Sequence, residues 1–430
     1  MTVFVCYFLE RPAGIDINTF IFAFGADGQP LPFPNNPASF FLPAQSQLAK
    51  LGSEIFGTAL STPQAGWIRV SGDIAELGCI YQFGDLAGNQ LDGSVAATQP
   101  SRQLRFTRVF EGPGAFRNRT ASTFLSIANP NAAPITMTLN LLGPQANQAL
   151  APPQTVTVPA NGVLCWTVSQ IFHSVLSINS GWIDVQVTAG DGAVGFEMVQ
   201  FPDSKTIVGS NAVTGGAVNQ SFSAQLAITP QYFTNLKLIN TSTLPRTVTL
   251  HAILESGADL ITPQIANLAV GQALEQDAGE LFGLSSAVGS LRVDADGPGI
   301  IGDVIFADPQ AMSFAASSQL QSTKFSQAVF SQVANGMNYF TGVALLNPNP
   351  QATSVTLDVF TETGVKAGSN TVSLGPGQRL SKLLAQMVPS SAGQMRGFVM
   401  MTSTLPIIGQ ELFGDTGMLF LSAIPPQVVK

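Results

Sequence analysis

The chain has 430 residues, of which only 10% are charged, and its 18 Lys and Arg against 26 Asp and Glu give a net charge of −8. Average globular proteins carry roughly 25% charged residues, so the surface is expected to be neutral and polar, as in secreted β-proteins. The thin spread of basic residues excludes a nucleic-acid-binding stripe. No apolar run reaches the length of roughly 18 residues that a membrane helix requires.

One order of sequence signals occurs four times along the chain. The Asn that ends the first strand of a unit recurs as Asn129, Asn240 and Asn347, which are 111 and 107 residues apart. A Gly before an apolar strand recurs in all four units, as Gly66, Gly181, Gly289 and Gly397. A unit of about 110 residues is near the common domain size and can close its own core. The sequence therefore predicts an all-β protein of four tandem Ig-like β-sandwich domains, each with a short helix, at residues 1–105, 106–216, 217–324 and 325–430.

The first unit opens with a predicted strand at residues 3–9. A strand at 20–24 with a turn at 25–28 follows, and then a strand and turn at 40–45. Apolar residues at 48, 51, 55 and 56 have helical spacing and predict one or two helical turns. Strands at 66–70 and 79–83 complete the unit.

The later units repeat this order. Unit two has predicted strands at 123–128, 135–142, 154–158, 163–172, 182–187 and 194–201. Unit three diverges most, and its short helix ends at 281–283. Unit four is the most regular, with an alternating strand at 354–360 and a candidate helix at 380–387. In the alternating strand at 247–254, Val248 and Leu250 should point inward, whereas Thr247, Thr249 and His251 should point outward.

The motifs of unit four resemble those of tandem β-sandwich repeats in large bacterial secreted and cell-surface proteins. They are Thr341-Gly-Val-Ala-Leu-Leu-Asn-Pro-Asn349, Leu374-Gly-Pro-Gly-Gln378 and Pro406-Ile-Ile-Gly-Gln-Glu-Leu-Phe-Gly414. The resemblance covers nearly the whole chain and is best in units two and four. It implies an extracellular spacer or adhesive unit, and it carries no active site.

A polar-apolar segment leads into units two, three and four at residues 104–110, 222–228 and 325–330, and nothing equivalent precedes unit one. One terminal domain is therefore expected to leave an open sheet edge, which can pair with another chain. The alternatives are a fragment or a capped terminal domain. The candidate interaction edges are Thr2, Val3, Phe4, Val5, Val428 and Val429.

Three cysteines are too few for a disulfide scaffold. Cys6 and Cys79 both fall on predicted strands of unit one and form a candidate disulfide; the alternative is two buried small apolar residues. Cys165 lies beside Trp166 in an apolar stretch and is expected in the core. Trp67 and Trp182 hold one repeat position, which favours two buried tryptophans over a sugar-binding surface.

Catalytic and metal-binding patterns find little support. The two histidines, His173 and His251, lie in different units without a nucleophile motif, and no Cys/His spacing fits zinc. The acidic turns at 26–28 and 294–299 could offer oxygens to Ca²⁺, but Asp-Gly is foremost a turn former. We expect no catalytic residues, no metal and no cofactor.

The sequence thus predicts an extracellular or cell-surface structural protein that is not an enzyme. It would be the subunit of a fibre, filament or stalk, with head-to-tail self-association by strand exchange. The alternative is an adhesin or a module that binds glycan or another surface protein. The first nine residues are typical of a strand and not of a signal peptide, so no export signal is recognised in this chain.

Overall fold

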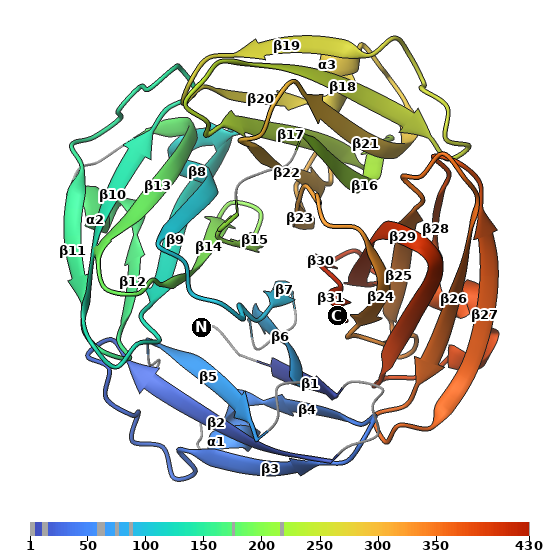
Figure 1. Ribbon diagram of the computed structural model, residues 1–430, viewed down its shortest axis with the longest axis horizontal. Helices are drawn as coiled ribbons and strands as arrows, with labels where there is room; N and C mark the ends of the chain where they lie inside the picture. Colours follow the sequence, from blue (N-terminus) through green and yellow to red (C-terminus); the bar gives the residue numbers. More distant parts are fainter. Residues whose placement is uncertain are drawn as a thin grey trace.

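The computed structural model describes residues 5–10, 16–57, 65–73, 77–85, 89–173, 177–215 and 219–429, with the backbone alone for residues 5–10. The chain is mostly β, as the predicted all-β class requires, and its strands fall into four groups around one axis (Figure 1). We call these groups units one to four in chain order. No helix in the described ranges is long and apolar enough to cross a membrane.

Unit three has two four-stranded antiparallel sheets. The strand order is β16-β21-β18-β19 in the outer sheet and β20-β17-β22-β23 in the inner sheet, and a short helix follows β20. Its elements are β16 (Gln220–Ile228), β17 (Phe233–Asn240), β18 (Arg246–Leu254), β19 (Gln264–Leu268), β20 (Ala273–Asp277), α3 (Ala278–Phe282), β21 (Ala287–Ala295), β22 (Ile300–Ala307) and β23 (Ala315–Gln319).

Unit two repeats this order, with β8 in the place of β16 and with β8 continuing into a hairpin with β9. Its elements are β8 (Gln103–Phe116), β9 (Arg119–Ala128), β10 (Ile135–Leu142), β11 (Gln154–Val158), β12 (Val163–Thr167), α2 (Val168–Phe172), β13 (Ile178–Ala189), β14 (Val194–Phe201) and β15 (Thr206–Asn211).

In unit four one long strand, β29, serves both sheets, and β31 adds to the outer sheet beside β24. The elements are β24 (Phe325–Phe330), β25 (Tyr339–Leu346), β26 (Thr353–Phe360), β27 (Lys366–Leu374), β28 (Arg379–Leu383), α4 (Leu384–Met387), the 3₁₀ turn η1 (Pro389–Ser391), β29 (Phe398–Asp415), β30 (Leu421–Ile424) and β31 (Gln427–Val428).

Unit one has the inner sheet β4-β1-β6-β7 and, among its described residues, an outer sheet of three strands, β3-β2-β5. Its elements are β1 (Val5–Glu10), β2 (Ile17–Gly25), β3 (Ala38–Leu42), β4 (Gln47–Leu51), α1 (Gly52–Phe56), β5 (Gly66–Gly72), β6 (Leu77–Gly84) and β7 (Leu91–Val95). We call β8, β16 and β24, which open units two to four, the lead strands.

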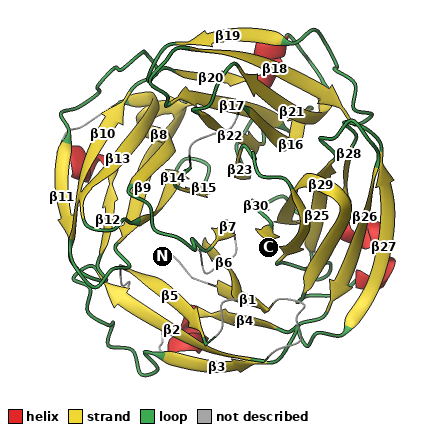
Figure 2. Cartoon of the chain, in the orientation of Figure 1, coloured by secondary structure: helices red, strands yellow, loops and turns green. Residues whose placement is uncertain are grey.

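Each unit carries one short α-helix at an equivalent place (Figure 2). The helical stretches predicted at 48–56 and 380–387 are correct only in their second halves, because β4 and β28 occupy the first halves. Periodicity was a poor guide here, since an edge strand that runs directly into one helical turn mixes the two spacings.

Alternation of apolar and polar residues builds the cores. Along β10, Ile135, Met137, Leu139 and Leu141 are buried, and the residues between them are partly exposed. These four side chains belong to one cluster with residues of β8, β9, β13 and α2, which is the core of unit two. A strand such as β10 thus buries one face, as its period of two requires.

The recurring Asn at the end of the first inner strand has a structural cause. The Asn129 side chain is fully buried, and its Nδ2 donates to the carbonyl oxygens of Ala133 and Pro159 at 2.8 Å each. Its Oδ1 accepts from the backbone N of Asn131 at 3.0 Å. Asn240 and Asn347 repeat the donation to the carbonyl oxygen four residues on and the acceptance from the backbone N two residues on. Asn240 also donates to Leu268 O, and Asn347 donates to Leu374 O and Gly375 O. An amide is needed because the position must both donate and accept.

The units close into a ring around the axis (Figure 1). The innermost strands β7, β15, β23 and β30 contact one another in cyclic order, so that unit four lies against unit one. One chain is therefore a ring and not an extended row of modules.

Candidate functional site: the joints of the ring

Each unit meets the next through a pair of turns. The turn after the second outer-sheet strand of one unit packs on the turn that precedes the edge strand of the inner sheet in the next unit. An equivalent backbone hydrogen bond occurs at three of the joints, with N···O distances of 2.8–3.0 Å. Its donor and acceptor are Ala273 N and Pro144 O between units two and three, Arg379 N and Glu255 O between units three and four, and Gln47 N and Glu362 O between units four and one. The third of these joins unit one to unit four and closes the ring.

Glycine is required at these contacts. Gly28 has a φ of 81°, and a Cβ added to it would lie 1.9 Å from the carbonyl oxygen of Ala160 in unit two. Gly364, with a φ of 82°, would place a Cβ 2.6 Å from the carbonyl oxygen of Gln45 in unit one. Only glycine combines the left-handed conformation with this close approach. The turn at 26–28, weighed above as a calcium loop, is thus part of a joint.

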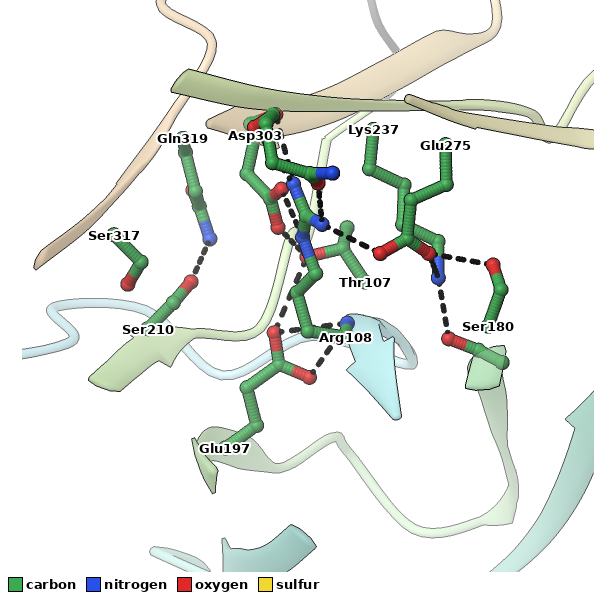
Figure 3. Close-up of polar contacts among 12 residues, drawn as sticks. Thr107, Arg108, Ser180, Glu197, Ser210, Lys237, Glu275, Asp303, Ser317 and Gln319 are labelled. Atoms are coloured by element: carbon green, nitrogen blue, oxygen red, sulfur yellow. Dashed lines mark hydrogen bonds and ion pairs between the residues drawn. The ribbon is translucent and has the colours of Figure 1, made fainter. Parts of the chain in front are cut away.

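The joint between units two and three buries a network of charged side chains (Figure 3). Arg108 of the lead strand β8 is 2% exposed. Its Nε donates to Asp303 of β22 at 2.5 Å, and its Nη1 donates to Glu275 of β20 at 2.9 Å and to the Asn235 side chain at 2.5 Å. The Thr107 hydroxyl also donates to Asp303. One guanidinium of unit two therefore ties three strands of unit three together.

Lys237 of β17 is a second buried cation in this network. It forms an ion pair with Glu275 at 2.9 Å and donates to the carbonyl oxygen of Gly181 in unit two at 2.7 Å. The Ser180 hydroxyl donates at 2.5 Å to the same Glu275 oxygen, Oε2, that pairs with Lys237, and Arg108 contacts Oε1. Buried charges are tolerated where each is paired and hydrogen-bonded, as here.

The pKa directions follow from this arrangement. Burial opposes the charged form of Arg108, but Asp303 and Glu275 outweigh it and raise the Arg108 pKa. Burial likewise opposes a charged Glu275, and Lys237 and Arg108 overcome it, so the Glu275 pKa is lowered. Burial lowers the pKa of Lys237 despite Glu275.

Glu197 of β14 also belongs to this network, with its carboxyl group protonated and therefore uncharged. Burial, together with the nearby charge of Asp303, raises the pKa of Glu197 to about 8. Its carboxyl group accepts from the backbone N of Arg108 at 3.2 Å. Glu411 has the same role in unit four, where it accepts from the backbone N of Gln332 and burial raises its pKa well above the ordinary value.

At the next two joints, other polar side chains make the contacts between neighbouring units. Arg379 of unit four donates to the carbonyl oxygen of Ala224 in unit three at 2.5 Å and pairs with Glu255 at 2.8 Å. Burial lowers the Arg379 pKa to about 10, with Glu255 opposing. At the closing joint, Gln47 of unit one donates to the carbonyl oxygens of Ser331 and Gly397 in unit four.

Asp92 lies fully buried at the ring axis and links three units. Its carboxylate accepts from the backbone N of Gly209 in unit two at 2.6 Å and from the Ser422 hydroxyl of unit four at 2.8 Å. Burial raises the Asp92 pKa to about 7, although these hydrogen bonds oppose the shift. Hydrogen bonds to a buried carboxyl group therefore connect the units at the centre of the ring.

The structure places the predicted edge residues as follows. Thr2, Val3 and Phe4 lie outside the described residues. Val5 lies on β1, whose backbone pairs with β4 on one side and β6 on the other, so it is not at a sheet edge. Val428 pairs with Ala328 of β24 and is 45% exposed, and the backbone N of Val429 donates to Gln327 O.

The candidate disulfide stays a prediction. Cys6 lies on β1 opposite Tyr81, and Cys79 of the neighbouring strand β6 lies opposite Phe8. The Cys6 side chain is outside the described residues. Cys165, expected in the core, is only partly buried and contacts the Ser126 hydroxyl at 3.5 Å.

Two predictions of exposure or burial differ from the structure. His251 lies outside the core, between the core residues Leu250 and Ala252, but it is only 8% exposed because Asp259 and Asp294 lie at 2.9 and 3.1 Å from its ring nitrogens. Trp182 is buried as predicted, at 4% exposed. Trp67 is only partly buried, and its Nε1 donates to the carbonyl oxygen of Asn161 across the joint of units one and two.

Sequence reasoning missed the joint residues, although a signal was present. Lys237 is the single cation of the apolar strand β17, at Leu236-Lys-Leu238, and Arg108 is one of two arginines among the apolar residues of β8, at Thr107-Arg-Val109. A cation at such a position is expected to find a buried partner. Nothing local indicates that the partner is another unit. Within the described ranges, no group of three or more His, Cys, Asp or Glu side chains is placed to hold a metal ion.

Comparison with known proteins adds little to this geometry. No family model matches the chain, and no curated protein matches it. Among solved structures, the Escherichia coli alpha-2-macroglobulin activated by porcine elastase is similar over 97% of this chain with 10% identity and a TM-score of 0.11. This chain spans 42% of that structure. A TM-score this low supports no argument about fold or function.

Proposed function

We propose that this protein is a structural component of the cell surface or extracellular space, a rigid ring of four Ig-like β-sandwich repeats that assembles with other chains into a fibre or stalk. The observation that supports it best is the closing contact of Gln47 with Ser331 and Gly397. This Gln47 contact is buried and holds the first and last units together. A ring closed in this way holds its surfaces in fixed positions, which suits a building block.

Composition and resemblance support the location. The chain carries few charges, and its motifs resemble those of repeat modules in bacterial secreted and surface proteins. Self-association through strand edges is the assembly mode that we propose to test first. The C-terminal β31, with Val428 partly exposed, is one described edge that a second copy can reach.

The first experiment is negative-stain electron microscopy of the purified chain over a concentration series, combined with small-angle scattering at the lowest concentration. We expect single rings when dilute, with a radius of gyration close to the value of about 22 Å for a compact chain of this length. Filaments or stacked rings are expected when concentrated. Single rings at every concentration would remove self-assembly from the proposal, and a markedly larger radius would remove the ring.

A second candidate function, adhesion to a glycan or another surface protein, is favoured by aromatic residues on unit one. Phe41 of β3 is 61% exposed and Phe20 of β2 is 39% exposed. The equivalent positions of unit two carry Thr157 and Thr138. Trp166 of unit two is also 43% exposed. Exposed rings of this kind suit stacking against a ligand.

Glycan-array binding tests this candidate. Loss of binding in Phe41→Ala or Trp166→Ala, with unchanged melting temperature, would support it. Thr157→Ala, at the position of unit two that corresponds to Phe41, is the matched control. Trp182→Ala is unsuitable, because Trp182 is buried between units two and three and its loss would destabilise their contact.

A further inference from the structure

The outer sheet of unit one has an edge that is covered in the other units. In units two, three and four, a lead strand pairs antiparallel with β13, β21 and β29. The equivalent strand of unit one is β5, which follows the same recurring Gly. Among the described residues, β5 pairs with β2 on one side and with no strand on the other.

The position beside β5 that corresponds to a lead strand is bounded on its other side as well. The far edge of each lead strand meets the segment that follows the innermost strand of its unit, in the pairs Arg105 with Val213, Phe222 with Gln321 and Val329 with Gln427. By the register of β6 with β7 and of β14 with β15, Ala97 holds this position in unit one. Ala97 is exposed.

Burial shows that this place is less covered than its equivalents. Ile183 and Val185 of β13 are fully buried under the lead strand β8, whereas the equivalent Ile68 and Val70 of β5 are only partly buried. Every residue of β17 and β22 in unit three is buried, alternately in the core of that unit and against unit two.

The corresponding strands of unit two, β9 and β14, have partly exposed residues at every second position on the side of unit one. These residues include Phe124, Ser126, Phe196 and Met198. Both sides of the joint between units one and two are therefore incompletely covered at the same place.

We propose that an extended strand of a partner polypeptide binds antiparallel to the open edge of β5, between units one and two, in the position that the lead strands hold elsewhere. The three lead strands show what fits there. We assign the strand to a partner chain because the described strands of this chain already hold positions in its own ring. A second copy would have to release a strand such as β31 from β24.

The side chains of unit two define the chemistry of the partner strand. Lead-strand residue Arg108 faces Asn235, Lys237, Glu275 and Asp303 in unit three. By strand register, the corresponding residues of unit two are Phe124, Ser126, Cys165 and Phe196. An arginine would find no carboxylate there, so the partner strand carries an apolar residue at this position. Its core-facing residues are apolar, as Leu104, Phe106 and Val109 are in β8.

Fluorescently labelled peptides with the sequence of residues 324–334 test the proposal by anisotropy on the full chain. This segment includes β24, and its Gln332 holds the position of Arg108. We expect the peptide with Gln332→Leu to bind at least about tenfold more tightly than the peptide with Gln332→Arg, a difference of about 1.4 kcal/mol. A peptide with proline in place of Ala328 and Phe330 should not bind, because proline cannot complete the strand ladder.

Protein variants locate the site. Phe124→Arg changes a partly exposed side chain on the unit-two side and should weaken binding by at least about tenfold. Thr155→Arg, an exposed position on the outer strand β11 of the same unit, should leave binding unchanged. Hydrogen exchange should show new protection of the backbone amides at 66–72 when the peptide is bound, a readout that does not depend on any variant.

The inference that a partner strand binds beside β5 rests on the proposed assembly role, but the strand site can fail while the assembly role stands. No peptide binding, binding indifferent to Phe124→Arg, or protection outside 66–72 would each overturn it. If filaments still form in the microscope, the proposed function stands and the β5 edge is not its contact. Binding of the peptide to a chain that never assembles would support the strand site and leave the partner as the assembling component.

Discussion

The side-chain amide of Gln47 donates a hydrogen bond to the carbonyl oxygen of Ser331 at 2.7 Å, although 284 residues separate the two in the chain. The same side chain accepts from the backbone N of Gly397 at 2.8 Å. At the joint of units four and one, Gln47 has the role that Arg379 has at the joint of units three and four. Gln47 thus adds one neutral side-chain amide, with both of its polar atoms used, to the backbone and Asp92 contacts that also close the ring.

Replacing Gln47 should loosen the ring. Gln47→Ala leaves the carbonyl oxygens of Ser331 and Gly397 buried without a donor, which costs about 1–3 kcal/mol for each unsatisfied group. We expect a lower melting temperature by calorimetry and a larger radius of gyration before unfolding. Gln154→Ala, whose exposed amide contacts only Pro152 O, is the control and should change neither. A Gln47 variant with unchanged melting and radius would contradict the role of this joint.

Replacing Arg108 should be more damaging. Arg108→Met leaves the buried carboxylate of Asp303 without its main partner and removes one of the two cations beside Glu275, so a loss of about 3–5 kcal/mol is expected. Arg396→Ala is the matched control, because Arg396 is 59% exposed and its pair with Glu362 is worth under about 1 kcal/mol. Denaturant unfolding measures both. Equal effects of the two substitutions would show that the buried network does not hold units two and three together.

Stability should fall as the pH rises, because of Glu197. Burial raises its pKa to about 8 in the folded chain, so the folded chain keeps a proton that the unfolded chain loses near pH 4.5. This stabilisation is complete below the unfolded pKa and is lost as the pH rises through the folded one. The loss is roughly 3 kcal/mol by pH 7 and roughly 5 kcal/mol by pH 9.

Calorimetry between pH 5 and pH 9 tests this pH dependence. Glu197→Gln keeps an acceptor for the backbone N of Arg108 and removes the titration, so its melting temperature should fall less steeply with pH. Glu280→Gln, at an exposed helix position, should keep the full slope. Asp92, with a pKa raised to about 7, contributes in the same direction and remains in all three proteins. Identical slopes for Glu197→Gln and the native chain would refute the assignment.

The recurring Asn should not tolerate a carboxylate. In Asn347→Asp, an oxygen replaces Nδ2 and would face the carbonyl oxygens of Gln351, Leu374 and Gly375. In the native chain these three oxygens accept hydrogen bonds from Nδ2 at 2.7–3.1 Å. The expected cost is about 3 kcal/mol or more at neutral pH, because both donors are lost in a buried place. Asn118→Asp, in an exposed turn with a φ of 60°, should cost little. Thermal melting compares them, and equal stability would show that the repeated Asn is not a structural requirement.

The succession of strands along the chain and the turns between them could be predicted from the sequence. The Asn and Gly signals at nearly constant spacing, and the alternation in segments such as β10 and β26, are local patterns that each unit satisfies on its own. The extra segment that precedes units two to four was also visible, and it corresponds to the lead strands. The helix starts were misplaced because β4 and β28 run directly into α1 and α4.

The sequence by itself determined the repeated unit, because a strand that buries one face must alternate and a tight turn must use Gly or Asn. Only the tertiary structure decided that four units close into a ring, and that Arg108, Lys237, Glu275 and Asp303 meet inside one joint. Those contacts join strands far apart in the chain, and whether a charged side chain is solvated or buried depends on the neighbouring unit that covers it. The same dependence explains why the edge of β5 could be located only once the other three joints had been seen.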